Sequence, residues 1–149
     1  TILRPCNIVG PSVQNTMGRL LASHRAPVLA GFSPMMQFMH IDDMADAIVL
    51  AYNKPVRGIF NVASDDWVAY QRALELSGCK RIPVPSVPPV LPRLILRTLR
   101  LQSFPAYLME FFKYPVVIDG QAFAKEFGFQ PKRPLKEIFR FYRDNKRPL

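Results

Sequence analysis

Cysteine is scarce in this sequence, with two residues among 149. Cys6 and Cys79 lie far apart, and neither belongs to a Cys-x-x-Cys or His-x-x-x-His spacing. This usage excludes the disulfide framework of a small secreted domain and gives no zinc-ligand pattern. The sequence therefore predicts a reducing, cytoplasmic setting.

Long apolar runs are missing as well. The most apolar stretch, residues 84–101, is interrupted by prolines and by three arginines. A membrane-spanning helix needs about 20 consecutive apolar residues, so no span is expected here.

Glycine is spread too thinly to form a dinucleotide-binding loop. Such a loop needs glycines two and three residues apart directly after a first strand. The seven glycines of this chain come no closer than eight residues to one another. The sequence as given therefore holds no Gly-x-Gly-x-x-Gly fingerprint.

Acidic residues are outnumbered, 11 against 20 basic ones, which gives a net charge of +9. Residues 125–149 hold eight basic and three acidic side chains, and Arg93, Arg97 and Arg100 follow a helical spacing that is typical of a solvated face. Nucleic-acid binding is disfavoured because the aromatic residues follow apolar helix faces instead of alternating with the basic residues. An acidic partner, including a phosphorylated small molecule, is left open.

What the sequence does contain is an alternation of strand and helix signals along its first half. Asp42 and Asp43 begin the clearest helix, where the helix dipole favours acids, and Lys54-Pro55 ends it. The other expected elements are strands at 2–9, 27–30, 37–41, 58–63 and 81–85, and helices at 15–25 and 70–77. Such alternation predicts an α/β fold with parallel strands.

After Pro85 the pattern becomes mainly helical. Helices are expected over residues 87–101, 104–113 and 120–127, with a strand fragment at 116–119. Pro134 opens a final helix, since proline is favoured at the first helical position. The chain is therefore divided into residues 1–85 and residues 86–149.

Four segments carry a family resemblance in the same order. The run LRPCNIVGP at 3–11 resembles the LRPxNxYGP strand and turn of extended short-chain dehydrogenases, with Val9 in place of the aromatic residue. QFMHIDDMADAI at 37–48 resembles their xFIHVDDxAxAI signature, GIFNVA at 58–63 their GxxFNV strand, and EFGFQP at 126–131 their closing LGFxP segment. The chain thus resembles the C-terminal portion of the NAD(P)-dependent epimerase/dehydratase family, and the likeness covers nearly all of it.

The resemblance implies a fold and a cofactor site. Residues 1–85 would be the C-terminal part of a Rossmann-like, doubly wound parallel sheet, and residues 86–149 a small helical substrate-binding region with a closing helix. Ligands of open α/β sheets bind outside the carboxyl ends of the strands. Backbone near Pro5 and Cys6 is then expected to contact the nicotinamide carboxamide of NAD or NADP.

The resemblance also implies a substrate site that includes Asn7, Met36 and Gln37. The Asn7 amide, both donor and acceptor, would orient the substrate or an adjoining loop, although a turn-forming amide before Gly10 is the alternative. Nucleotide-sugar epimerases carry a diphosphate-binding arginine at the start of the second motif. Met36 and Gln37 stand there and offer no cationic fork for a phosphate.

The family's catalytic Tyr-x-x-x-Lys pair is expected to lie before Thr1. A second match, from Tyr142 to Lys146, is interpreted as core packing because Tyr142 completes an apolar stripe of the last helix. Helix capping is taken to explain Asp42, Asp43 and Asp46. No residue of this chain is assigned a catalytic or metal-binding role.

The leading hypothesis is part of an NAD(P)-dependent epimerase/dehydratase-type oxidoreductase that acts on a sugar-like or small hydroxyl/carbonyl substrate. Its partner would be the N-terminal part of the same fold; a homodimer is left open, and the chain alone is expected to bind neither NAD nor NADP. The alternative is a non-catalytic binding or regulatory module that keeps a remnant of the fold and a basic tail.

Overall fold

The computed structural model describes residues 1–85 and 111–147. The helix expected over 87–101, with the arginine stripe from Arg93 to Arg100, lies outside the described residues. So does the helix expected over 104–113, except for its last three residues. The described strands are β1 (Ile2–Pro5), β2 (Asn7–Val9), β3 (Arg25–Leu29), β4 (Met35–His40), β5 (Ile59–Val62), β6 (Trp67–Ala69) and β7 (Lys80–Val84). The described helices are α1 (Thr16–Ala22), α2 (Ile41–Asn53), α3 (Tyr70–Leu76), α6 (Gln121–Phe127) and α7 (Leu135–Asp144).

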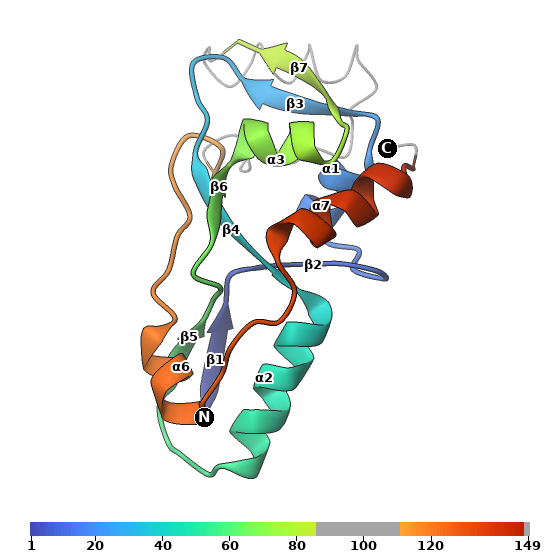
Figure 1. The fold of residues 1–149 in the computed structure, drawn as a ribbon. Coiled ribbons are helices and arrows are strands. Elements are labelled where there is room, and N and C mark those ends of the chain that lie inside the picture. Colours follow the sequence, from blue (N-terminus) through green and yellow to red (C-terminus); the bar gives the residue numbers. More distant parts are fainter. Residues whose placement is uncertain (86–110, 148–149) are drawn as a thin grey trace.

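Three strand pairs are parallel, as the alternation predicts. β1 pairs with β5, β2 with β4, and β3 with β7. The exception is β6, which adds to β4 in the antiparallel sense and was not expected as a separate strand. In Figure 1, β1 and β5 lie beside α2 and α6 in the lower half, and β3 and β7 lie beyond α3 in the upper half.

The expected single strand over residues 2–9 is wrong in one respect, because the chain bends at Cys6. The Cys6 N–H still donates to the Val62 carbonyl at 3.0 Å and closes the β1–β5 ladder. From Asn7 onward the chain pairs with β4 instead, with Asn7 opposite Phe38. The bend therefore links two sheets at the carboxyl end of β1.

Helix boundaries follow local capping chemistry. The Asn15 side chain accepts the Gly18 N–H at 2.7 Å and starts α1. Gly128 ends α6 in the left-handed conformation, φ 66°, which a residue without Cβ adopts at low cost. His40 caps α2, because its side chain accepts from the Asp42 N–H.

The described residues form two apolar cores. The first gathers β2, β3, β4, α1, α3 and α7, with Phe38 edge-on to Phe139 at a centroid distance of 5.6 Å. The second gathers α2, β5 and α6 around Phe123 and Phe127. The first core combines residues from both sides of position 85, and the division into 1–85 and 86–149 stays a prediction.

Among the described residues no helix combines the length and the apolarity needed to cross a bilayer.

Candidate functional site at the carboxyl ends of two parallel strands

The candidate site begins where β1 and β5 end. Pro5 is the partner of Val62 in the parallel register, so both strands finish at the same edge. Pro5 is exposed there, and it has no N–H to donate. With the Cys6 N–H already bonded to Val62, neither of these two residues has a backbone donor left to offer a ligand.

Cys6 is half-buried, and its burial raises the pKa of the thiol to about 11. A thiol with this pKa stays protonated at neutral pH and is a poor nucleophile. The side chain packs against the second core beside residues of β5. The contact with the nicotinamide that is expected of Cys6 would therefore be made by its backbone, and the thiol packs against the second core.

Asn7 lies one residue further on. Its Nδ2 donates to the Gln37 carbonyl at 3.0 Å, so the amide braces the start of β2 against β4. The Asn7 Oδ1 has no partner in the described part of the chain. One end of the amide is thus structural, and the other keeps an acceptor for a ligand.

Gln37 connects the two strand ends to a distant segment. Its side chain is buried, with Nε2 donating to the Ser64 carbonyl at 3.0 Å and Oε1 accepting the Ile118 N–H at 2.7 Å. The Ser64 Oγ in turn donates to the Phe38 carbonyl at 3.0 Å. Gln37 therefore fixes the loop after β5 and the strand-like segment before α6.

Met36, the other residue expected at the substrate, has no exposed surface and packs in the first core. Gln37 is 3% exposed. The structure brings Pro5, Cys6, Asn7 and Gln37 together at one edge and turns Met36 inward. Their ligand roles stay predictions.

Gly120 completes this edge, and sequence reasoning missed it. A Cβ at this position would come within 2.9 Å of the Ala63 nitrogen and 3.0 Å of the Ala63 oxygen, both backbone atoms that cannot give way. The close approach keeps residues 118–120 against the loop after β5. A glycine as the first residue of the helix expected over 120–127 was the available signal, but its partner lies far away in the sequence.

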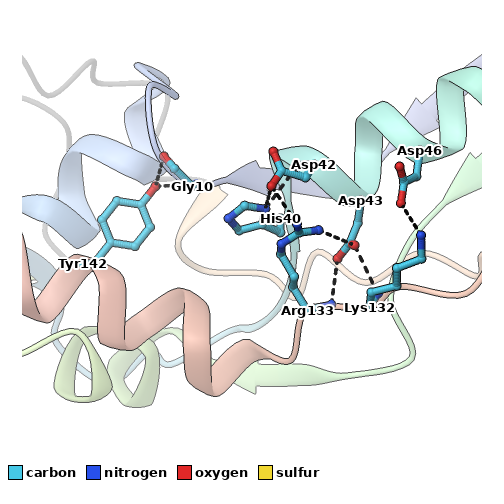
Figure 2. Close-up of polar contacts among 8 residues, drawn as sticks. All are labelled: Gly10, His40, Asp42, Asp43, Asp46, Lys132, Arg133 and Tyr142. Carbon is cyan, nitrogen blue, oxygen red and sulfur yellow. Dashed lines mark hydrogen bonds and ion pairs between the residues drawn. The ribbon is translucent and has the colours of Figure 1, made fainter.

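The acids of the second motif hold a different segment. Asp43 is 1% exposed, and its two carboxylate oxygens accept the backbone N–H groups of Lys132 and Arg133 at 3.1 and 3.2 Å. Figure 2 shows the Arg133 side chain reaching both Asp42 and Asp43, at 2.9 and 3.4 Å. The capping interpretation is therefore wrong for Asp43, which anchors the connection between α6 and α7.

Asp46 adds an outer contact to the same connection. Its carboxylate accepts from the Lys132 ammonium at 2.7 Å, and this hydrogen bond lowers the carboxyl pKa. The group is exposed, so solvent screens the pair and its share of stability is small.

The Tyr142 to Lys146 match is structural, as expected. The Tyr142 hydroxyl accepts the Gly10 N–H at 2.9 Å and donates to the Gly10 carbonyl at 3.3 Å (Figure 2). Burial raises the pKa of the phenol. The Lys146 ammonium donates to the carbonyls of Leu21 and Ser23, so both groups of the motif are occupied in holding α7 to the rest of the fold.

Comparisons with known proteins agree with this architecture. The model of the NAD dependent epimerase/dehydratase family matches residues 1–63. An uncharacterised protein of Mycobacterium tuberculosis H37Rv is 28% identical over 142 residues, which are 95% of this chain and 38% of that protein. The chain therefore spans well under half the length of this relative.

Solved structures show the same fold at low identity. UDP-glucuronic acid 4-epimerase from Bacillus cereus, in complex with UDP-glucuronic acid and NAD, superposes with a TM-score of 0.66 at 16% identity, covering 97% of this chain and 44% of that one. RMD from Pseudomonas aeruginosa, complexed with NADPH, gives 0.65 at 14% identity, covering 96% and 46%.

The expected fold is thereby confirmed. The family model matches residues 1–63, as the resemblance predicts, and the chain has the Rossmann-like α/β fold of the solved structures over nearly its whole length. It spans about 45% of the solved structures that it matches.

Proposed function

We propose that this chain is the substrate-side portion of an NAD(P)-dependent epimerase/dehydratase-type oxidoreductase that acts on a sugar-like or small hydroxyl/carbonyl substrate in the cytoplasm. One observation carries the proposal. The carboxyl ends of β1 and β5 meet at an edge where Asn7, Gln37 and Ser64 form a connected polar network. Ligands of open parallel sheets bind at such edges.

The backbone at the end of β1 fits the nicotinamide end of the cofactor. Pro5 has no N–H and the Cys6 N–H is used, so these residues can offer carbonyl oxygens only. The carboxamide NH2 group of nicotinamide donates hydrogen bonds, and the carbonyl oxygens of Pro5 and Cys6 could accept them. The cofactor, when bound, would supply a hydride acceptor, and NAD and NADP both satisfy this chemistry.

The proposed substrate contacts involve the side-chain amides of Asn7 and Gln37. Asn7 keeps an acceptor oxygen for a substrate hydroxyl, whereas Gln37 acts by holding the loop after β5 in place. The similar solved structures carry UDP-glucuronic acid with NAD, or NADPH, and we take nucleotide sugars as the first substrates to test. The remainder of such a fold, with the glycine-rich loop and the catalytic tyrosine, would be the chain's principal partner.

Cofactor binding tests the proposal. Calorimetric titration of the native protein that contains this chain should give a micromolar Kd for NAD or NADP, while residues 1–149 alone should bind neither, because the phosphate-binding loop is absent from this sequence. A native protein that binds neither cofactor would contradict the proposal.

Cys6→Ser is the matched control for this titration. Because the thiol is protonated and the expected contacts are made by the backbone, the variant should keep the Kd within about twofold. The kcat/KM profile should likewise show no thiol-dependent limb between about pH 6 and 9, since a pKa near 11 lies above this range. A pH dependence of kcat/KM that disappears in Cys6→Ser would show that the side chain of Cys6, and not its backbone, acts at the site.

A further inference from the structure

Trp67, the only tryptophan of the sequence, lies beside this edge, and its side chain belongs to neither apolar core of the described residues. It begins β6, five residues after the last residue of β5, and 57% of its surface is exposed. An indole buries a large apolar area when it finds a partner, so leaving it in water forgoes a considerable stabilisation. Its position at the carboxyl end of the parallel pair is where a ligand would cover it.

The register of β6 decides which way the indole faces. Trp67 is the antiparallel partner of Gln37, and cross-strand partners project from the same side of a sheet. Val68, the next residue, packs against the first core, so Trp67 projects from the opposite side. The indole therefore shares a face with the Gln37 amide that braces the site.

The loop leading to Trp67 is held in place and carries negative charge. The Ser64 carbonyl is bonded to Gln37, and the Ser64 hydroxyl donates to the Phe38 carbonyl. Asp65 and Asp66 follow, both exposed and without a side-chain partner among the described residues. Two exposed carboxylates next to the indole in the sequence disfavour a phosphate at that point, and carboxylates are ready acceptors for hydroxyl groups.

We propose that Trp67 is a substrate-binding residue on which the neutral, hydroxyl-bearing ring of the substrate stacks, with its hydroxyls toward the Asp65–Asp66 pair. The apolar face of a sugar ring covers the indole, and the ring's edge carries the donors that carboxylates accept. This inference rests on the proposed function and names the part of the substrate that the loop after β5 contacts.

Calorimetry on the native protein with UDP-glucose and with UDP tests the inference. Trp67→Ala should weaken UDP-glucose binding about tenfold or more and leave UDP binding within about twofold, because only the first ligand carries the stacked ring. Trp67→Phe should restore most of the affinity. Tyr52→Ala is the matched control, since Tyr52 is 87% exposed on the last turn of α2, near the opposite ends of the strands (Figure 1).

Each other outcome overturns the inference. Unchanged UDP-glucose binding by Trp67→Ala, or an equal loss for UDP and UDP-glucose, would remove the indole from the sugar subsite and leave the proposed function intact. A native protein that binds NAD or NADP but not UDP-glucose would contradict the sugar-ring assignment alone. A native protein that binds neither NAD nor NADP would contradict the proposed function. Unfolding midpoints and the Trp67→Phe variant separate a binding loss from misfolding.

Discussion

Replacing Asp43 by Ala is expected to lower the free energy of unfolding by about 3 kcal/mol, because a buried acceptor that serves several donors disappears at once. The substitution would leave the backbone N–H groups of Lys132 and Arg133 without their carboxylate and the Arg133 guanidinium without one of its two partners. In the native protein that contains this chain, the loss should lower Tm by several degrees. Urea and thermal unfolding measure both quantities.

Asp46→Asn is the matched control for this prediction. Asp46 lies on the same helix and holds the same connection, but its contact with the Lys132 ammonium is exposed. The control should leave Tm nearly unchanged. Equal effects at the two positions would show that charge near the connection, and not the buried carboxylate, sets its stability.

Replacing Asn7 by Ala in the native protein is expected to lower kcat/KM about 100-fold while reducing stability by about 1 kcal/mol. The stability term is the lost hydrogen bond to the Gln37 carbonyl. The kinetic term is larger because the amide would orient the reacting part of the substrate, and a misplacement of about 1 Å costs a large factor in rate. Kinetics and unfolding midpoints are measured on the same preparation.

Asn7→Asp separates the two ends of the side chain. The aspartate keeps an acceptor for the substrate but cannot donate to Gln37, so it should share the stability loss and retain more activity than alanine. Unchanged kinetics with a lowered midpoint in Asn7→Ala would establish a purely structural role for the amide, which braces β2 against β4, and leave the backbone near Pro5 and Cys6 as the remaining assignment.

The sequence predicted the elements whose signals are local. The strand at 58–63, the helix that begins at Asp42 and the ends of the helices at 70–77 and 120–127 depend on neighbouring residues, and the structure has them close to the expected places. The parallel pairing followed from the alternation of strands and helices. The first motif gave the cofactor contact near Pro5 and Cys6, although the strand was expected to continue through residue 9.

The features that were missed depend on partners far away in the sequence. Asp43 was predicted to be an acid that stabilises the start of a helix. Nothing near it in the sequence shows that its hydrogen-bond donors lie 89 and 90 residues further along the chain. Gln37 looked like a ligand residue, and its bond to Ile118 spans 81 residues. The bend at Cys6 was hidden by a mostly apolar run, because β1 and β2 differ in their pairing partners, which the sequence does not show.

Product analysis is the most direct test of the central claim. The native protein containing this chain is incubated with UDP-glucose, UDP-glucuronic acid or dTDP-glucose in the presence of NAD or NADP, and the sugar products are separated by chromatography and identified by mass and by standards. The proposed function predicts an epimerised, dehydrated or oxidised sugar whose formation requires the nicotinamide cofactor and falls in Asn7→Ala. Unaltered substrates in every combination, from a protein that is folded and saturated with cofactor, would contradict a nucleotide-sugar substrate, and a native protein that binds neither NAD nor NADP would contradict the proposed function itself.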